Sequence, residues 1–441
     1  MMSITCKFGG SSLADASQFQ KVAAIVNADP ERRFIVPSAP GKRHDDDTKI
    51  TDLLYLCHEA IRQRVTYDEA FGLIADRYID LAQWLDLDLD VEDLLGHLRA
   101  DLERGASVDY VASRGEYLNG KILAALLEAV YVEPAEHIRF DADGRLDPVT
   151  YELLGNALDG EGRYVIPGFY GASADGEVKT FSRGGSDITG AVVARAAGAK
   201  VYENWTDVSG LLMADPRVVS NPRPVEEITY REIRELSYMG ASVFHDEAMF
   251  PVREVGIPIH IKNTNDPDAK GTRIQKTRIP KDHALGGVAG RPGFTMLFIE
   301  KALMNQLKGF GRRVLEVIAA HDISYEHTPS GIDTISVIVS DEELAGRGAL
   351  LLEEIERTLD PDRTELLPGL ALIATVGEGM SHQIGIAAKL FSALADAGVN
   401  VRVIDQGASE INIIVGVEES DYEQAVRAIY HAFESDGSGP R

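Results

Sequence analysis

The chain has 441 residues, which is enough for two to four domains at about 150 residues each. Apolar residues make up 44% and charged residues 26%, as in soluble globular proteins, so a disordered or fibrous chain is excluded. The formal net charge of −26 would repel phosphate groups, so neither nucleic acid nor an anionic membrane is expected as a partner.

The two cysteines, Cys6 and Cys57, are too few for a disulfide framework or a thiolate metal site, and they suit a reducing compartment. Residues 1–10 show no export signal, and no apolar run approaches the roughly 18 residues of a membrane-spanning helix. These features predict a cytoplasmic protein.

The first two-thirds of the sequence alternates β-like runs with helical stretches, which is typical of an α/β domain around a mostly parallel sheet. It opens with a strand at residues 4–8, a glycine turn at 9–12 and a helix at 15–26. A polar loop is expected at 41–48, and residues 51–130 are expected to be mostly helical with a break near Gly105. Further short strands are predicted at 34–36, 164–166, 200–202 and 257–261.

An internal repeat follows the composition change at Ile279-Pro280. Residues 304–339 align without gaps on residues 380–415, an offset of 76, with seven of 36 positions identical. Each copy reads as strand, loop, helix, strand, turn, strand and helix. Two copies are too few for a solenoid, so the repeat predicts a pair of small sheet domains.

The first motif with chemical meaning is Lys7-Phe8-Gly9-Gly10-Ser11-Ser12, a lysine at a strand end followed by a glycine turn and a helix start. Glycines let backbone amides approach phosphate oxygens, and the ammonium supplies a point charge. Alone, the pair of glycines would equally fit an ordinary strand-to-helix turn. The sequence contains neither a Walker P-loop nor the protein-kinase signatures.

A second glycine turn, at residues 182–187, leads into a helix predicted at 188–197. Arg183 could form a fork on a carboxylate, and Asp187 could anchor a lysine. The alternative is a helix N-cap by Ser186 with Asp187 favouring the helix dipole, which accounts for Asp187 but not for Arg183.

Two weaker motifs complete the set. Ser113-Arg114-Gly115-Glu116 precedes a helix, so Glu116 either receives an amino group or is only an acid in a first turn. Residues 206–217 form a strand end and a turn with an arginine after a proline, a segment that can hold a nucleotide.

Together with residues 240–245, these motifs occur in the order and spacing of the aspartate kinases, and the repeat resembles their tandem ACT domains. The resemblance, to the monofunctional type, implies an α/β fold with an amino-acid-kinase αβα sandwich around a mostly parallel sheet at 1–283. Two ferredoxin-like βαββαβ ACT domains are expected after it, at 284–360 and 361–441.

The resemblance also implies roles for single residues. Lys7 would neutralise the transferring phosphoryl group and Asp187 would position Lys7. The residues expected to contact the amino-acid substrate are Ser38, Thr51, Glu116 and Arg183. Those expected to contact ATP, besides Lys7, are Gly9, Gly10, Thr206, Asp207, Leu212 and Arg217. An effector pocket is expected around Met304, Gly309, Tyr325 and Glu326, unless these residues form only a helix-start loop and a strand.

Three positions depart from the family pattern. Leu212 stands where a tyrosine is common, and residues 39–50 are longer and more charged than the usual spacer between Ser38 and Thr51. Trp205 replaces a smaller or differently shaped residue and is expected to pack near the base.

The expected reaction is ATP-dependent phosphorylation of the side-chain carboxylate of L-aspartate to 4-phospho-L-aspartate, the first step towards lysine, threonine and methionine. Mg²⁺ would be held largely by the nucleotide phosphates. Feedback by lysine, threonine, both or neither stays open, and a homodimer or higher oligomer is expected. The alternatives are a kinase for glutamate or acetylglutamate, and an inactive amino-acid sensor. The Ser-x-Gly-Glu element and the repeat argue against the first alternative, and the presence of Lys7, Arg183 and Asp187 argues against the second.

Overall fold

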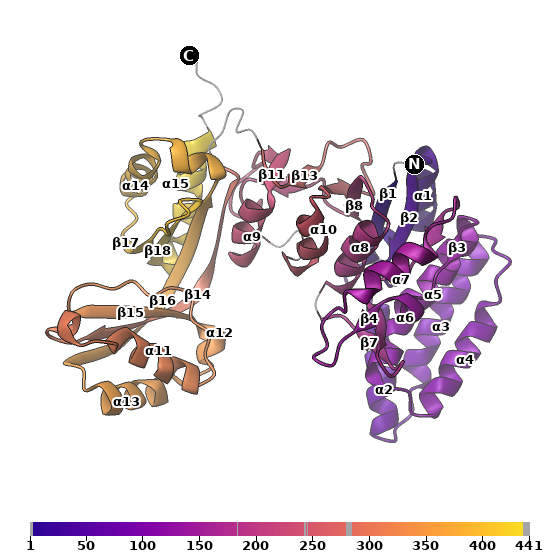
Figure 1. The fold of residues 1–441 in the computed structure, drawn as a ribbon, viewed down its shortest axis with the longest axis horizontal. Helices are drawn as coiled ribbons and strands as arrows, with labels where there is room; N and C mark the ends of the chain where they lie inside the picture. The colour runs from indigo at the N-terminus through magenta and orange to yellow at the C-terminus, as the bar shows by residue number, and fades with distance from the viewer. Residues whose placement is uncertain (1–2, 183, 242–243, 245, 279–284, 435–441) are drawn as a thin grey trace, which may run out of the picture. The chain divides into compact units, whose positions relative to one another are not determined.

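The computed structural model describes residues 3–182, 184–241, 244, 246–278 and 285–434. The chain divides into two compact units (Figure 1). The first unit contains Met1–Leu211, Pro224–Tyr230 and Val243–Arg278, and the second contains Leu212–Arg223, Arg231–Ser242 and Ile279–Arg441. The sequence predicts a single boundary after residue 283. In the structure, residues 212–223 and 231–242, which precede that boundary, also belong to the second unit.

The first unit is built on an eight-stranded sheet in the order β11-β13-β12-β8-β1-β2-β5-β3. Its pairs are parallel except for β12 with β13, which confirms the mostly parallel sheet. The four central strands are β1 (Ile4–Phe8), β2 (Arg32–Pro37), β8 (Val201–Thr206) and β12 (Ile259–Asn263). The outer strands are β3 (Val130–Tyr131), β5 (Tyr164–Val165), β11 (Glu227–Thr229) and β13 (Thr272–Gln275).

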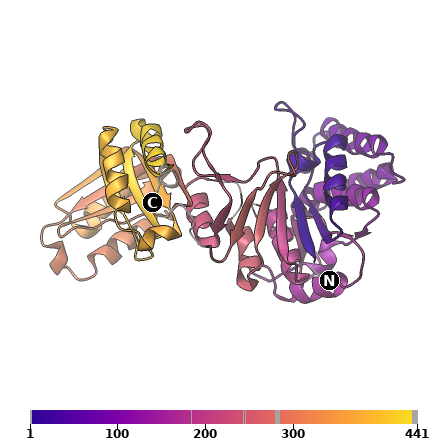
Figure 2. The ribbon, with the colours of Figure 1, turned by 90° about the horizontal axis from the view of Figure 1, so that it is seen from above.

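Helices cover both faces of this sheet (Figure 2). In β1 and β8, Lys7 is in register with Asn204 and Phe8 with Trp205, so each pair projects to the same face. Phe8 and Trp205 belong to the core built with helix α1 (Ala16–Ala28) and the four helices between residues 50 and 126. Lys7 and Asn204 project to the opposite face, which helix α8 (Gly185–Ala196) covers.

The helices begin and end close to the predicted positions. Asp15 caps α1 by accepting a hydrogen bond from the Gln18 amide at 3.0 Å. The stretch expected to be mostly helical forms four helices. The longer helices of the first unit are α1 (Ala16–Ala28), α2 (Ile50–Arg62), α3 (Asp68–Trp84), α4 (Val91–Glu103), α5 (Val108–Leu126), α7 (Val149–Ala157), α8 (Gly185–Ala196) and α10 (Phe250–Val255).

Several short elements have no counterpart in the sequence prediction, because two to four residues carry too little periodicity to be recognised. The strands β4, β6 and β7 form a small separate sheet. These elements are β4 (Arg139–Phe140), β6 (Tyr170–Ser173), β7 (Val178–Thr180), β9 (Leu211–Leu212), β10 (Pro224–Val225) and α6 (Pro134–His137). Among the helices of the described ranges, none combines the length and apolar character needed to cross a membrane.

The second unit contains a five-stranded antiparallel sheet in the order β15-β14-β16-β18-β17. Its strands are β14 (Gly287–Glu300), β15 (Thr334–Ser340), β16 (Arg363–Val376), β17 (Val401–Asp405) and β18 (Asn412–Glu418). Its helices are α9 (Tyr230–Tyr238, whose first residue belongs to the first unit), α11 (Phe310–Ala320), α12 (Asp341–Leu344), α13 (Gly348–Leu359), α14 (Ile386–Asp396) and α15 (Tyr422–Glu434).

The long strands β14 and β16 carry matching bulges at Pro292-Gly293 and Pro368-Gly369. One extra residue in β14 shifts the register before Phe294, and one extra residue in β16 shifts it back. Gly293 and Gly369 have φ values of 89° and 76°, which only glycine adopts readily. The two Pro-Gly pairs are 76 positions apart, so the duplication extends further towards the N-terminus than residue 304.

The two copies of the repeat therefore interleave. β15 pairs with β14 at 294–300, whereas β18 pairs with β16 at 370–376. Each half of the sheet uses part of both long strands, and β16 runs through both halves although the expected boundary at 360/361 lies just before it. In the first copy the predicted second strand is reduced to isolated bridges at His327 and Ser330.

Candidate active site

Lys7 and Asp187 form a buried ion pair at the centre of the first unit. The ammonium of Lys7 lies 2.6 Å from Oδ1 of Asp187, and their side chains are 9% and 15% exposed. Lys7 is the fourth residue of β1, and Asp187 is the third residue of α8. A strand end and a helix start thus bring together two residues that are 180 positions apart.

The glycine turn before α8 explains how Asp187 reaches this position. Gly184 has a φ of 70° and is the residue before the helix, which begins at Gly185. Ser186 is therefore inside the helix, and the alternative that made it the N-cap is wrong. Arg183 lies outside the described residues, as do residues 242–243 and 245 of the motif at 240–245.

The first glycine turn packs tightly against its neighbours. The Gly9 amide donates a hydrogen bond to the carbonyl of Trp205 at 3.0 Å, and a Cβ on Gly9 would lie 3.6 Å from the Lys7 ammonium. A Cβ on Gly10 would lie 3.0 Å from the carbonyl oxygen of Ala39. The short helix η1 (Gly10–Leu13) starts here, so its first amides have no partner within that helix.

The charged segment 39–50 is held in place by a buried arginine of α3. Arg77 lies 2.5 Å from Asp47 and donates to the carbonyls of Gly41 at 3.1 Å and Ala14 at 3.2 Å. Arg43 also pairs with Asp47 at 2.9 Å. Hydrogen bonds from Arg43 and the charge of Arg77 hold the pKa of Asp47 well below its usual range. The Gly41 amide also donates to the carbonyl of Gly10 at 2.9 Å, so the unusual spacer is a loop fixed to the glycine turn.

The predicted substrate residues Ser38 and Thr51 lie at the two ends of this loop. Ser38 follows β2, where its amide donates to the carbonyl of Phe8 at 3.0 Å. Its own carbonyl accepts a hydrogen bond from Nδ2 of Asn119 at 2.7 Å. Thr51 is half-buried in the first turn of α2.

Glu116 is buried in the middle of α5, so the expectation that residues 113–116 precede a helix, and the alternative of an acid in a first turn, are wrong. Its Oε2 lacks a hydrogen-bond partner among the described residues. Burial raises its pKa to about 8, although the Ala39 amide and the charges of Arg114 and Lys7 act in the opposite direction. Asn119 follows one helical turn later, and its Oδ1 is also buried without a described partner. Each of these two oxygens is thus a buried acceptor without a described donor, which is uncommon for polar atoms in a protein interior.

The predicted nucleotide residues are distributed over both units. Thr206 ends β8, and its hydroxyl donates to Asp207 at 3.1 Å. In the second unit, Leu212 is 38% exposed. There Arg217 is paired with Asp215 at 2.6 Å.

Trp205 packs in the core rather than on an open surface. It is 1% exposed, and its ring stacks on Phe8 with 5.9 Å between ring centroids. The expectation that it packs near the base is not supported by this burial.

Sequence reasoning did not identify Asn119, Arg77 and Asn204 as site residues. Asn119 could have been found from its spacing of three after Glu116, which places both on one helix face. Asn204 stands beside Glu203 in a strand that is buried on both faces, where two successive polar residues need an explanation. Its Nδ2 donates to Oδ1 of Asp187 at 2.6 Å.

The predicted effector residues lie in the first half of the second unit's sheet. Met304 starts a short helix, and Gly309 is the residue before α11 with a φ of 76°. The Glu326 amide donates to the carbonyl of Ile338 at 2.8 Å, and its side chain is 9% exposed and paired with Arg291 at 3.1 Å. Tyr325 is 45% exposed.

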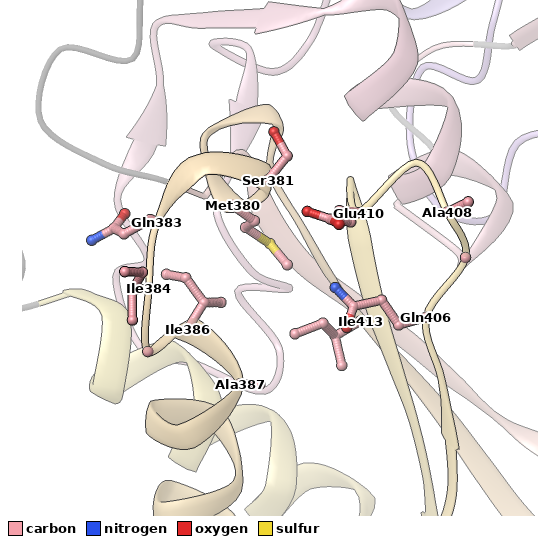
Figure 3. Close-up of a pocket in the computed structure, with 12 residues that line it drawn as sticks. Met380, Ser381, Gln383, Ile384, Ile386, Ala387, Gln406, Ala408, Glu410 and Ile413 are labelled. Atoms are coloured by element: carbon pink, nitrogen blue, oxygen red, sulfur yellow. The ribbon is translucent and has the colours of Figure 1, made fainter.

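A cavity of about 660 Å³ occupies the equivalent position in the second half (Figure 3). Met380 and Gly385, which line it, are the repeat equivalents of Met304 and Gly309. Glu410 lies across the cavity from Ser381 in the close-up. The amide of Glu378, at the start of this loop, donates to the buried carboxylate of Glu232 on α9 at 2.8 Å.

In the part of the chain that the structure describes, no group of three or more His, Cys, Asp and Glu side chains is placed to hold a metal ion. Both cysteines are buried and free.

Comparisons with known proteins identify the family of the chain. The model of the amino acid kinase family matches residues 2–263, and an ACT domain model matches residues 373–433. Aspartokinase 3 of Bacillus subtilis is 41% identical over 443 residues, which cover 97% of this chain and 98% of the relative.

Solved structures show the same similarity. The aspartate kinase of Clostridium acetobutylicum superposes with a TM-score of 0.95 at 50% identity, covering 98% of this chain and 100% of that one. Aspartokinase III of E. coli has a TM-score of 0.76 at 27% identity over 98% of this chain and 99–100% of that one. It was solved with aspartate and ADP in an R-state, and with lysine and aspartate in a T-state.

The family resemblance inferred from the motifs is thus confirmed along nearly the whole chain. With an amino-acid-kinase domain, a C-terminal ACT-type sheet and a relative 41% identical over almost its full length, the chain belongs to the aspartokinase family and is an aspartate kinase, the enzyme that opens the biosynthesis of the aspartate-derived amino acids.

Proposed function

We propose that Lys7 carries the reaction by which this chain transfers the γ-phosphoryl group of ATP to the side-chain carboxylate of L-aspartate. The observation that carries the proposal is the buried ion pair of Lys7 and Asp187 beside the glycine turn. An ammonium has three donors, so Lys7 can contact Asp187 and still present N–H groups to a phosphate.

The chemistry needs charge stabilisation rather than a general base. The side-chain carboxylate of aspartate has an ordinary pKa of about 3.9, so it is already ionised at neutral pH. One of its oxygens forms a bond to the γ-phosphorus, the bond to the β,γ-bridging oxygen breaks, and ADP leaves with that electron pair. Lys7 offsets the negative charge that two approaching anions bring together.

For the substrate amino group we propose Glu116, together with Oδ1 of Asn119. Both offer buried oxygens without described partners, and a bound ammonium would return Glu116 to its ionised form. Ser38 and Thr51 are proposed as further contacts at the ends of the ordered loop, and Arg183 as the fork on the α-carboxylate.

For the nucleotide we propose the turn at Gly9 and Gly10, with Thr206, Asp207, Leu212 and Arg217 as further contacts. The Gly9 amide already donates to Trp205 and the Ser12 amide to the Gly9 carbonyl, so the amides of this turn that remain for a phosphate are those of Gly10 and Ser11. Mg²⁺ would arrive with ATP, bound to its phosphates, because the described residues form no acidic cage for it.

For regulation we propose that an amino-acid effector binds at the loop before α11, with Met304, Gly309, Tyr325 and Glu326. The T-state structure of the E. coli relative is a complex with lysine and aspartate. In this chain the carboxylate of Glu326 is already paired with Arg291, so an effector ammonium must compete with that guanidinium. Inhibition by lysine, by threonine and by their mixture, measured for the parent and Glu326→Gln, tests this role. Glu410→Gln, in the equivalent half, is the matched control.

A coupled assay of ADP release tests the substrate assignment. Aspartate should support turnover, whereas glutamate and N-acetylglutamate should not.

Arg183→Lys should raise the KM for aspartate more than the KM for ATP, because a lysine cannot form the bidentate fork. A rise confined to the KM for ATP would move Arg183 to the nucleotide site. Sedimentation of the full chain tests the expected homodimer.

A further inference from the structure

Asn204 lies at the centre of the sheet and touches the same carboxylate oxygen as the lysine. It is 4% exposed in β8, and its Nδ2 donates to Oδ1 of Asp187 at 2.6 Å. The Lys7 ammonium also lies 2.6 Å from that oxygen. Oδ1 of Asp187 therefore receives one charged donor and one neutral donor, from two neighbouring strands.

A second contact fixes the backbone of Asp187 from the same strand. The hydroxyl of Tyr202 donates to the main-chain carbonyl of Asp187 at 3.1 Å, and it lies 3.4 Å from Nδ2 of Asn204. Tyr202 is fully buried. The start of α8 is thus held by alternate residues of β8, which project to the same face of the sheet.

The two donors differ in what happens to them during turnover. When a phosphate draws the Lys7 ammonium away, Asp187 loses part of its only described cation. A carboxylate this buried needs another donor to keep its position and its charge. Asn204 is neutral and sits in a central strand, so it stays in place whether or not Lys7 moves.

We propose that Asn204 is a positioning residue for phosphoryl transfer, which holds the Asp187 carboxylate so that Asp187 can direct Lys7 to the transferred group. The inference rests on the proposed role of Lys7. The alternative is that Asn204 merely satisfies its own buried amide, in which case its removal costs stability alone.

Replacement by leucine separates these two roles. In Asn204→Leu we expect kcat to fall about tenfold, the loss of one supporting hydrogen bond, with the KM values for aspartate and ATP within about twofold of the parent. Ile261→Ala is the control, because Ile261 is buried in β12 in register with Asn204 and its apolar side chain cannot donate a hydrogen bond to Asp187. It should lower the melting temperature at least as much and leave kcat unchanged.

Replacement by aspartate gives a signature that a structural role would not produce. In Asn204→Asp two carboxyl groups share the 2.6 Å contact, and such a pair retains one proton at low pH and repels when both groups ionise. We expect kcat of this variant to approach that of the parent at the acidic end of the activity range and to fall steadily as pH rises. The parent should not show this fall.

Two results would overturn the inference. One is Asn204→Leu with the kcat of the parent, and the other is Asn204→Asp with the pH profile of the parent. The Lys7→Ala variant, assayed in parallel, distinguishes a failure of the proposed function from a failure of the role of Asn204 alone. If it stays active, the proposed function fails, whereas an inactive Lys7→Ala beside a fully active Asn204→Leu defeats only the role of Asn204.

Discussion

Two buried ion pairs lie on opposite faces of the same sheet, and they are built differently. On one face Lys7 of β1 meets Asp187 at 2.6 Å. On the other, Arg32 of β2 meets Glu203 of β8 at 2.8 Å. Their burial is similar, with side-chain exposures of 9% and 15% in the first pair and 13% and 7% in the second. Burial alone therefore does not tell which pair carries chemistry.

The second pair is saturated. Glu203 accepts two hydrogen bonds from Arg32, at 2.8 and 3.3 Å, and one from the indole of Trp205 at 2.9 Å. The thiol of Cys6 also lies 3.4 Å from it, and both burial and Glu203 raise the pKa of that thiol. Arg32 donates further to the carbonyl of Ile25 at 2.7 Å. Both partners are committed, which is typical of a pair that fixes structure.

The first pair is open by comparison. Within the described residues, Lys7 pairs with Asp187 alone, and a glycine turn lies beside it. An ammonium on a flexible stem with unused donors can turn towards a ligand, whereas a guanidinium held at several points cannot. The number of unused donors, rather than the degree of burial, separates the face proposed to be catalytic from the one that fixes structure.

Lys7→Ala should break the open pair with the largest effect on activity. We expect kcat to fall about 100- to 1000-fold, as for other single contacts to a transition-state charge. The melting temperature should fall as well, because the Asp187 carboxylate stays buried without a counter-charge, although the amide of Asn204 still donates to it. Steady-state kinetics of the purified variant and its thermal unfolding check both halves, and a kcat near that of the parent would remove Lys7 from the mechanism.

Glu203→Gln should break the saturated pair and lower the stability of the protein, but unlike Lys7→Ala it should leave kcat unchanged. It leaves the Arg32 guanidinium buried without a counter-charge, which costs about 3 kcal/mol of unfolding free energy. For a unit of this size that corresponds to a fall in melting temperature of about 6–12 °C. Below the transition, kcat should match the parent. Thermal unfolding followed by circular dichroism, beside kinetics at low temperature, measures both, and a large loss of kcat in the folded variant would contradict the division between the two faces.

Asp187→Asn should weaken the open pair without removing the lysine. The amide keeps the shape but presents no charge to Lys7, and we expect kcat to fall by about 10- to 100-fold while aspartate still binds. If Asp187 served only the helix dipole, asparagine would be nearly neutral for activity. Kinetics together with aspartate binding by calorimetry distinguish the two roles.

Much of this face could be predicted from the sequence, because the glycine turns mark where strands and helices meet. Lys7 and Asp187 could be identified from their motifs, and the structure brings them into contact. The partners of these residues could not be identified in this way. Asn204 and Arg77 act through contacts between residues far apart in the chain, and no local spacing encodes those contacts.

The strand order of the five-stranded sheet in the second unit could not be predicted from the sequence either. The offset of 76 predicted two copies, but not that β14 and β16 each run through both of them. The Pro-Gly bulges were visible in the sequence at the same offset, and they are the signal that could have revealed the shared strands. Phe169, with a φ of 78°, shows a similar limit, since nothing local marks it for a left-handed conformation.

Glu116 is a buried acid that forms no ion pair among the described residues. Burial raises its pKa from an ordinary value of 4.5 to about 8. Between these values the folded protein holds a proton that the unfolded chain has lost, so this group makes the unfolding free energy fall as pH rises through that window. Glu116→Gln should remove that part of the pH dependence of the melting temperature.

The same proton should couple to substrate binding. The ammonium group of aspartate favours ionised Glu116, so binding below about pH 8 must release the proton, and the KM for aspartate should fall by up to about tenfold per unit as pH rises from 6 towards 8. In Glu116→Gln the KM should be higher and nearly independent of pH over this range. Asp109→Asn, at the start of the same helix, is the matched control and should keep the slope of the parent. Calorimetry in two buffers of different ionisation enthalpy detects the released proton directly. Equal slopes in the parent and in Glu116→Gln, or no proton release, would show that the substrate ammonium binds elsewhere.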